Sequence, residues 1–533
     1  MKSFDSISLI TMLNDRYNLI QDDSVSGLIL IESSQERMLK DLTDLYYKFS
    51  FIFLLDVKAS YIKGKLSIDY ILLNLEYHQR VVYRFPLDHP VEGVSHLWAS
   101  AQQLEKYLSY EYGVHFLDKK VDSSFIDIKN SKIFPKRVGD SSGFHQFRYQ
   151  RDNYFKRSPN VTCDFSEGLS VLSYGSSYKE FGGGDCFVEH DGEKIFNCVF
   201  ESFKYFQDIE QLMTKTRYDQ LVHQSVLLGP SLALCDSVVV ADLIEKTFQV
   251  TLSDHDQIIR MIFLELERAY NHFVFIENLA ASLEIDQVFR YANASRFLLL
   301  EFFQQCGLEP LMPKHVKLGG RNTSFSKTII YSLYEKIKTL KSNLGVIEKN
   351  ITQNRFLSSE LSEGVLTPQE ALAYSVTGPA LRASGVNYDL RKNSPLYFYS
   401  DVEFDIPLGV RGSSYDRYLV RVEEIRQSFK IIDQLLDNIP PQNINHSMLF
   451  PFGEKSLSIE GPMYNCIESP EGELGFFVDS QRPGDPYFFG RAFFRTPSLA
   501  STGVVEHIIK ASTIDSFFSV VSSLKLELEE MRK

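Results

Sequence analysis

The sequence predicts an α+β fold, in which an N-terminal α+β domain is followed by a longer, mainly helical domain with small β regions. Two observations favour this class. Within the first 120 residues, helical patterns alternate with apolar runs rich in Ile, Val and Tyr, which are typical of strands. From residue 205 onward, apolar side chains recur mostly at three- and four-residue spacing, which is typical of helices. The chain has 533 residues, 44% of them hydrophobic, which suffices for more than one core.

The N-terminal part is predicted to contain two helices and three strands. The helices cover residues 33–50 and 93–116, and Gly113 ends the second one. The run "FSFIFLLDV" (49–57) is a predicted buried strand, and "LSIDYILLNLEY" and "RVVYRFPL" are predicted to pair. Trp98, the only tryptophan of the chain, is expected to anchor a core or an interface.

A change of composition then predicts the domain boundaries. Residues 126–165 are rich in Ser, Asp, Lys and Arg with little periodicity, so we expect a linker between a domain at 1–125 and a domain at 166–533. Short strands with turns are predicted over 166–205, where a glycine triplet and an Asp-Gly pair occur.

The second domain is predicted to be built from long helices. Its predicted helices cover 255–284, about 325–350, 367–376 and 413–441. Thr, Pro and Glu at the start of the third helix form a typical N-terminal cap, and a Pro-Pro pair ends the fourth.

Charge and cysteine usage exclude several classes of protein. The net charge of −13 argues against nucleic-acid binding, because phosphate contacts need a basic surface. The six cysteines include no CxxC pair, and no histidines stand at metal-ligand spacing, so we expect reduced thiols and no metal bound by this chain. No apolar run reaches the roughly 18 residues that a membrane span requires.

Two of the predicted helices carry polar ridges beside their apolar stripes. Arg268 and His272 are four residues apart on the first, and Arg417 and Arg421 are four apart on another, next to Asp416. Such ridges are either solvated faces with surface ion pairs or buried ion networks between packed helices. The sequence alone leaves both interpretations open.

The last third of the chain resembles the quinone-site (D-type) subunit of respiratory NADH-quinone oxidoreductase (complex I). The resemblance rests on "GPALRASGVNYDLRKNSP" (378–395), "YDRYLVRVEEIRQS" (415–428) and "ESPEGELGFF" (468–477), the last of which looks like a hairpin of the family. The helix "GVSHLWASAQQLEKYLSYEYGVHF" (93–116) is similar to one in the C-type subunit. The chain therefore resembles the fused C/D subunit of bacterial complex I, whose D part shares its fold with the large subunit of nickel–iron hydrogenases.

The resemblance implies a setting and a set of partners. Quinone would be the substrate, and the iron–sulfur cluster that supplies electrons would lie in a partner, the B-type iron–sulfur subunit. Another partner would be the membrane subunit that borders the quinone channel. The chain would lie peripherally on the cytoplasmic face of the bacterial inner membrane.

The resemblance also implies roles for single residues. The matching motifs imply a structural network, in which side chains pin buried carboxylates or a partner's backbone. Its expected members are Arg268, His272, Arg382, Asp389, Arg391, Asp416, Arg417 and Arg421.

The residues that hold the quinone head group in the family are replaced here. The family's His loop falls on "SYGSSYKEFGGG" (173–184), which has no His but contains Tyr178. The family's quinone Tyr falls on Arg217 or Tyr218, and His223 follows shortly after. These four residues are candidate quinone ligands, because His and Tyr can deliver the protons that a reduced quinone takes up. No catalytic residue is assigned.

The resemblance and the replaced quinone residues suggest three possible functions. A nickel–iron hydrogenase is excluded, because its metals need two CxxC pairs that this chain lacks. A working quinone-site subunit with substitute ligands and a non-catalytic scaffold paralogue in a complex I-like assembly both remain open.

Overall fold

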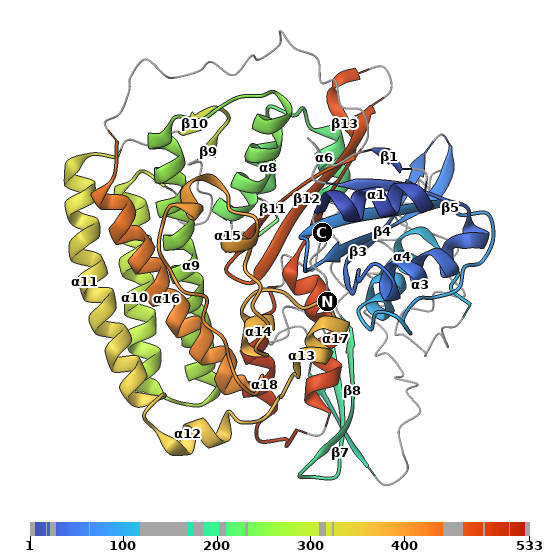
Figure 1. Cartoon of the computed structure of the whole chain (residues 1–533). Coiled ribbons are helices and arrows are strands. Elements are labelled where there is room, and N and C mark those ends of the chain that lie inside the picture. Colours follow the sequence, from blue (N-terminus) through green and yellow to red (C-terminus); the bar gives the residue numbers. More distant parts are fainter. Residues whose placement is uncertain are drawn as a thin grey trace. The chain divides into compact units, whose positions relative to one another are not determined.

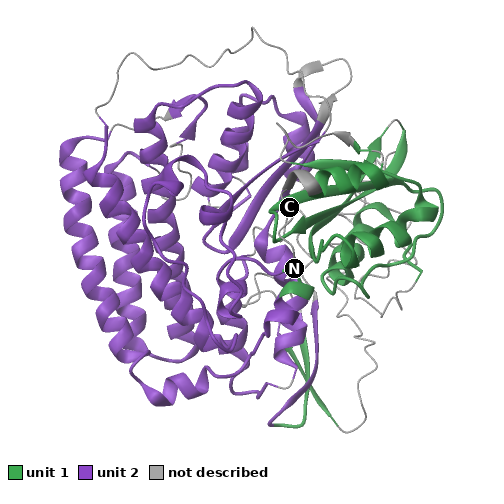
Figure 2. Cartoon of the chain, viewed as in Figure 1, with its two compact units in different colours: residues 1–173, 187–192, 372–375 green, residues 174–186, 193–371, 376–533 purple. Residues whose placement is uncertain are grey.

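The computed structural model describes the chain in segments that form two compact units, shown separately coloured in Figure 2. Unit 1 comprises residues 1–173, 187–192 and 372–375, and unit 2 comprises 174–186, 193–371 and 376–533. Helices and strands are both abundant, which confirms the predicted α+β class. The predicted linker at 126–165 lies outside the described residues, and the predicted domain boundaries stay predictions. The described residues are 6–17, 19–21, 28–62, 64–117, 169–174, 185–201, 209–226, 228–229, 233–308, 316–321, 325–440, 462–482, 485–510 and 512–527.

Unit 1 is built on a five-stranded sheet with strand order β1-β2-β5-β4-β3. β2 and β5 pair in parallel, and the other neighbours are antiparallel. The predicted pairing of the two Ile- and Val-rich runs is confirmed, since Tyr70 of β4 lies opposite Tyr83 of β5. The elements are α1 (Ser6–Arg16), β1 (Leu19–Gln21), β2 (Ile29–Glu32), η1 (Gln35–Arg37), α3 (Met38–Tyr47), β3 (Phe53–Ile62), β4 (Lys65–Asn74), β5 (Gln79–Pro86) and α4 (Ala101–Tyr112).

The core of unit 1 contains Trp98, as predicted for this side chain. Its indole is fully buried and meets the ring of Tyr46 edge to face, with 5.3 Å between the ring centroids. The predicted helix at 93–116 begins only at Ala101. The preceding residues form turns instead, and the buried Glu105 carboxylate accepts from the backbone N–H of Val94 at 3.0 Å. Gly113 ends the helix with a φ of 70°, as predicted.

Three short strands follow in the region predicted to contain them. They are β6 (Ser170–Tyr174), β7 (Asp185–His190) and β8 (Ile195–Glu201). The Asp-Gly pair lies in the turn between β7 and β8, where Gly192 has a φ of 108°.

Unit 2 is mainly helical (Figure 1). The predicted long helices are confirmed as α9 (Asp254–Ser282), α11 (Lys327–Asn350) and α16 (Ser414–Asp437). Ser413 and Asp416 form a capping box at the start of α16. The other elements are α6 (Ile209–Lys215), α7 (Leu221–Ser225), α8 (Ala233–Thr247), α10 (Asp286–Gln305), β9 (Val316–Lys317), β10 (Gly320–Arg321), α12 (Arg355–Glu360), α13 (Pro368–Ala373), α14 (Gly378–Ala383), α15 (Leu390–Asn393), η4 (Tyr397–Ser400), β11 (Pro462–Ser469), β12 (Gly472–Arg482), β13 (Asp485–Arg495), α17 (Pro497–Ile509) and α18 (Phe517–Leu524).

The helices of unit 2 pack pairwise and also cover a small antiparallel sheet. α9 contacts α10 and α16, α11 contacts α10, and α8 packs on β11 and β12. The sheet has strand order β11-β12-β13, and β11 and β12 are joined by a tight turn at Gly472. One hydrophobic core runs through these helices and the sheet. No helix in the described part of the chain is long and apolar enough to cross a membrane.

Candidate functional site

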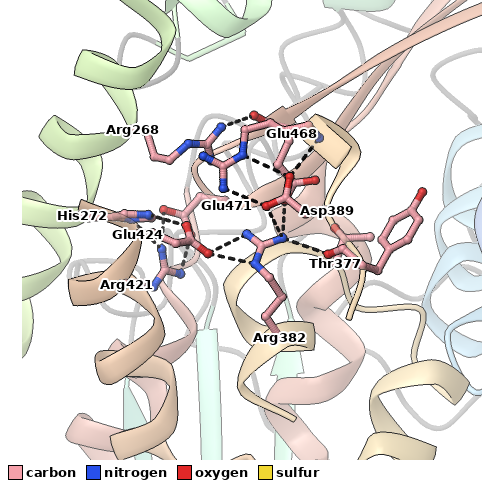
Figure 3. A network of polar contacts seen from close by, with 12 residues as sticks. Arg268, His272, Thr377, Arg382, Asp389, Arg421, Glu424, Glu468 and Glu471 are labelled. Atoms are coloured by element: carbon pink, nitrogen blue, oxygen red, sulfur yellow. Dashed lines mark hydrogen bonds and ion pairs between the residues drawn. The ribbon is translucent and has the colours of Figure 1, made fainter. Parts of the chain in front are cut away.

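The charged ridges of α9 and α16 meet in the interior of unit 2 (Figure 3). Arg268 and His272 on α9 and Arg421 on α16 are each at most 1% exposed. Of the two interpretations of the ridges, the structure therefore shows the buried ion network. Segments 378–395 and 462–479 supply the remaining side chains.

Arg382 of α14 lies at the centre of the network. Its Nε donates to the Glu424 carboxylate at 2.9 Å, and its Nη1 donates to the Glu468 carboxylate at 2.7 Å. Nη1 also donates to the carbonyl of Tyr388 at 3.0 Å and lies 3.5 Å from Asp389. One guanidinium thus ties α14 to α16 and to β11.

Arg391 forms the second node, on the α9 side. Its Nε and Nη2 bind both oxygens of Asp389 at 3.1 and 2.7 Å, and its Nη1 reaches Glu265 at 3.2 Å. The Glu265 carboxylate also accepts from the hydroxyls of Tyr399 at 2.6 Å and Ser428 at 2.5 Å. Such fork-shaped pairing fixes the orientation of both partners.

His272 connects two charged pairs without carrying charge itself. Its Nε2 lies 2.8 Å from Glu424, and its Nδ1 lies 3.3 Å from Nη1 of Arg421. Nη2 of the same arginine donates to Glu471 at 2.6 Å. A carboxylate only accepts and a guanidinium only donates, so Nε2 carries the proton and Nδ1 accepts. Burial lowers the pKa of His272 to about 3, so the ring stays neutral at pH 7.

The turn between β11 and β12 is fixed by backbone contacts as well as by charge. Arg268 donates to the carbonyls of Ser469 at 3.0 Å and Glu468 at 2.6 Å. Gly378 lies against this turn, where an added Cβ would come within 2.4 Å of the Glu471 carbonyl oxygen. Only glycine allows this approach, and the φ of 67° at Gly378 also favours it.

The ionisation of the network follows from the charges that surround each carboxyl. Burial alone would raise the pKa of Asp389, but Arg391 and Arg382 lower it to about 2. Against the same effect of burial, Arg382 and the hydrogen bond from His272 hold the pKa of Glu424 well below its ordinary value. Burial raises the pKa of Glu468 and Glu471, and their arginine partners offset this only in part.

Asp416 and Arg417, which were expected in the same network, lie in a separate cluster. Asp416 accepts from the backbone N–H groups of Val410 and Ser413 at 3.1 and 3.0 Å. Arg417 donates to the carbonyls of Gly364 and Gly412, both at 2.9 Å. This cluster fixes the start of α16 and the loop that precedes it.

A further buried arginine, Arg260, was not predicted from the sequence. It binds both oxygens of Glu245 at 2.9 and 2.8 Å, the hydroxyl of Tyr397 at 2.8 Å, and the carbonyls of Lys317 and Gly320 at 2.9 Å. It therefore anchors the β9–β10 hairpin. The signal available in the sequence was its position two turns before Arg268 on the same helix.

Three of the four candidate quinone ligands lie among the described residues. Tyr218 is fully buried in the helical core, with its ring centroid 4.9 Å from that of Phe248. The side chain of Arg217 is 43% exposed and binds Asp219 at 3.2 Å, and His223 on α7 is exposed. Tyr178 lies outside the described residues. The three described candidates thus differ in burial, and their assignment as quinone ligands stays a prediction.

The carboxylate partners of the network arginines were not predicted either. Glu265, Glu424, Glu468 and Glu471 are all buried, and each binds an arginine of the network. Two of them stand in the motif "ESPEGELGFF", for which the resemblance implied only a hairpin. Among the described residues, no group of three or more His, Cys, Asp or Glu side chains could hold a metal ion.

Comparisons with known proteins show what these segments are similar to. Residues 285–532 match the family model described as respiratory-chain NADH dehydrogenase, 49 kDa subunit. The chain is 30% identical over 353 residues to the first D-type subunit of NADH-quinone oxidoreductase from Roseiflexus sp. (strain RS-1), covering 65% of this chain and 93% of that protein. It is 28% identical over 366 residues to the D-type subunit from Geotalea uraniireducens, covering 64% and 93%. It is 26% identical over 369 residues to the second D-type subunit from Thermodesulfovibrio yellowstonii, covering 64% and 91%.

Proposed function

Because the chain belongs to the family of D-type subunits of NADH-quinone oxidoreductase, also described as the 49 kDa subunit, we propose that it forms the quinone-reduction cavity together with the B-type iron–sulfur subunit. The chain is a subunit of an oxidoreductase complex of the respiratory chain. Electrons would reach the quinone from a cluster held by the iron–sulfur subunit, and this chain would supply a wall of the cavity and the protons.

The observation that carries this proposal is the ion network itself. Two segments that resemble the family, 378–395 and 468–477, are tied together by Arg382, whose Nη1 donates to the Glu468 carboxylate at 2.7 Å. A site shared with another subunit needs a rigid framework, because a displacement of about 1 Å can cost much of the activity. The network supplies such a framework through charges that are buried and paired.

A loop beside the network supports the proposed docking of a partner. In the loop at 405–411, Leu408 is 44% exposed and Val410 is 89% exposed. The loop is nevertheless fixed, since the Gly409 N–H donates to the Arg382 carbonyl at 2.9 Å and Asp416 accepts from Val410. Exposed apolar side chains on a rigid backbone suit a protein partner, and the B-type iron–sulfur subunit is our proposal for it.

The remaining features of the proposal follow from the family. We place the chain peripherally on the cytoplasmic face of the bacterial inner membrane, next to the membrane subunit that borders the quinone channel. Unit 1 would be the C-type part of a fused C/D chain, with the boundaries 1–125, 126–165 and 166–533. Unit 2 would share the fold of nickel–iron hydrogenase large subunits.

Proton delivery is the step for which this chain must supply its own groups. Reduction of a quinone to a quinol takes up two electrons and two protons. Tyr178, Arg217, Tyr218 and His223 are the proposed ligands of the head group. Arg217 and His223 can reach a ligand at the surface of unit 2, whereas Tyr218 is buried and needs a rearrangement to do so.

The test is quinone reductase activity of the purified complex with Tyr178→Phe, Tyr218→Phe and His223→Ala, each measured beside Tyr331→Phe. Tyr331 on α11 is 69% exposed and serves as a matched control for loss of a hydroxyl. We expect a drop of about 10²-fold or more in at least one candidate variant, as for loss of a proton donor. A wild-type complex with all subunits present and full activity in every variant would contradict the proposed ligands.

A non-catalytic scaffold is the second candidate function. It is favoured by the absence of His from 173–184 and by the burial of Tyr218 in the core. An intact complex that oxidises NADH with an artificial acceptor but never reduces quinone would establish this alternative. Fold similarity alone does not separate the two.

A further inference from the structure

Two buried thiols lie next to each other in unit 2. The Sγ atoms of Cys186 in β7 and Cys198 in β8 are 3.4 Å apart. Cys186 is fully buried and Cys198 is 1% exposed. Neither residue belongs to the ion network or to the candidate quinone ligands.

The contact between two sulfurs distinguishes Cys186 and Cys198 from the other described cysteines. Cys235, Cys306 and Cys466 are also free thiols, and the first two are buried. Burial raises the pKa of Cys306 to about 12, as is typical of an inert thiol in an apolar environment. The sulfurs of Cys186 and Cys198, in contrast, are in contact with each other.

The distance fits a thiol pair that can close into a disulfide. A disulfide needs its sulfurs about 2.05 Å apart, so the two Sγ atoms must approach by little more than about 1 Å. Rotation of the two side chains can supply a movement of this size. The residues are 12 positions apart, and the turn at Gly192 brings their strands together.

One end of such a disulfide, Cys198, lies in a strand that is fixed to other parts of unit 2. β8 is fixed to the C-terminal part of unit 2, since the Ile195 N–H donates to the Ser512 carbonyl at 3.0 Å and the Phe200 N–H donates to Glu506 at 2.9 Å. Cys186 stands at the start of β7. A disulfide would therefore tie the beginning of β7 to an anchored strand.

We propose that Cys186 and Cys198 form a redox-active pair that hydrogen peroxide converts to an intrachain disulfide. One thiolate would attack the peroxide O–O bond, giving a sulfenic acid and releasing water once the leaving hydroxide takes up a proton. The second thiol would then attack the sulfenic sulfur, forming the S–S bond and releasing a second water. Two sulfurs lose two electrons in total, and the peroxide gains them.

Burial sets the rate of this reaction. The hydrogen bond to Cys186 and burial raise the pKa of Cys198 well above its ordinary value, which keeps it protonated at pH 7. Oxidation therefore has to wait for local opening of the strands, and the pair responds to sustained exposure to peroxide. This inference is independent of the proposed quinone chemistry, because it needs no quinone and no partner subunit.

The test is peptide mapping by mass spectrometry of the purified complex after treatment with hydrogen peroxide, with free thiols blocked before digestion. We expect a cross-linked peptide that contains Cys186 and Cys198 and is about 2 Da lighter than the sum of its parts. Cys235 and Cys306, which are buried free thiols, serve as internal controls and should remain alkylatable after denaturation.

Cys186→Ser and Cys198→Ser provide the matched variants. In either one, the remaining cysteine should end as a sulfenic or higher acid instead of a disulfide, because the resolving thiol is missing. If a single serine destabilises the buried site, the double variant Cys186→Ala/Cys198→Ala replaces the single variants. It should lack the cross-linked peptide after peroxide treatment. Disulfides that join either cysteine mainly to other partners, or unchanged thiols under peroxide that oxidises exposed methionines, would overturn the proposal.

Discussion

Unit 2 holds its buried charges in two different ways, and the balance between burial and partner charge sets their pKa values. In the ion network, Arg382, Asp389 and Glu424 each face a charge of opposite sign. Arg417 and Glu267 instead bind neutral groups, which are backbone groups and, for Arg417, also the hydroxyls of Ser414 and Ser523. Arg417 donates to carbonyls, and Glu267 accepts from the N–H groups of Leu234 and Cys235, both at 2.9 Å.

The pKa values of Asp389 and Glu267 differ in the direction of their shifts, whereas the paired Glu468 and Glu471 keep pKa values raised by burial. Opposite charges lower the pKa of Asp389 to about 2 in spite of burial. Burial dominates for the backbone-held charges, raising the pKa of Glu267 to about 7 and lowering that of Arg417 to about 9. The hydrogen bonds of Glu267 to neutral groups thus compensate less of the desolvation than the two arginines around Asp389 do.

The largest effect is expected from removing the centre of the network. Arg382→Met leaves Glu424, Glu468 and Asp389 buried without their shared cation, so we expect the free energy of unfolding to fall by about 3 to 5 kcal/mol. Urea unfolding of the full-length chain measures this. Arg426→Met on α16 is the control, because that side chain is 45% exposed and should change stability by no more than about 1 kcal/mol. Equal effects of the two variants would contradict the network as the source of rigidity.

A second substitution tests whether the loss of stability comes from the carboxylate that is left buried without its arginine. Arg421→Met leaves Glu471 buried without its arginine and should destabilise unit 2 by about 3 kcal/mol. Arg421→Met/Glu471→Gln removes both charges, so we expect it to be more stable than the single variant in the same urea titration.

A neighbouring cation has to be considered in this comparison of single and double variants. Lys525 lies 4.0 Å from Glu471 and compensates that carboxylate in the single variant only in part. A double variant that loses at least the sum of its two single losses would contradict the ion-pair interpretation.

The sequence predicted the helices of this network better than it predicted their contacts. Periodicity and capping residues located α9, α11 and α16, because local patterns decide where a helix begins and which face is apolar. Whether the polar ridge at Arg268 and Arg421 faces water or protein depends on what packs against it. That information lies in residues 378–395 and 468–471, more than a hundred positions from Arg268, and spacing along one helix does not contain it.

The exposure of the candidate quinone ligands could not be predicted from the sequence either. Motif alignment placed Arg217, Tyr218 and His223 at or near one family position, but their burial differs completely. Neighbours in a short loop and helix point in different directions, so their order in the chain does not tell which of them reach a ligand. Motif transfer brought together six of the eight expected network residues, whose environment is internal to this chain, whereas Asp416 and Arg417 lie in a separate cluster.

The pH dependence of stability should separate Glu267 from Asp389, a paired carboxyl whose pKa is lowered. The pKa of Glu267 is about 7 in the folded state against an ordinary value of 4.5, so its stabilising contribution is complete below pH 4.5 and is lost as pH rises toward 7. The expected loss is on the order of 2 to 3 kcal/mol. Asp389 has the opposite sign, because its contribution is present above about pH 4 and lost as pH falls toward 2.

Thermal unfolding of wild type and Glu267→Gln at pH 5 and pH 8 measures this contribution. The variant cannot ionise, so its stability relative to wild type should rise between the two pH values. A difference that does not change with pH would contradict the raised pKa.

The smallest effect is expected from Arg417, the other backbone-held charge. Arg417→Met leaves no carboxylate stranded, and the carbonyls of Gly364 and Gly412 lose one donor each, so we expect a loss of about 1 to 2 kcal/mol. This should be clearly less than for Arg421→Met, although the two arginines stand one turn apart on α16 and are both fully buried. Hydrogen exchange should localise the change to the segments around Gly364 and Gly412 and to α18, whose Ser523 hydroxyl accepts from Arg417 at 2.9 Å. If Arg417→Met instead matched Arg421→Met, the loss of a buried guanidinium itself, and not the charge it leaves behind, would set the cost in both regions.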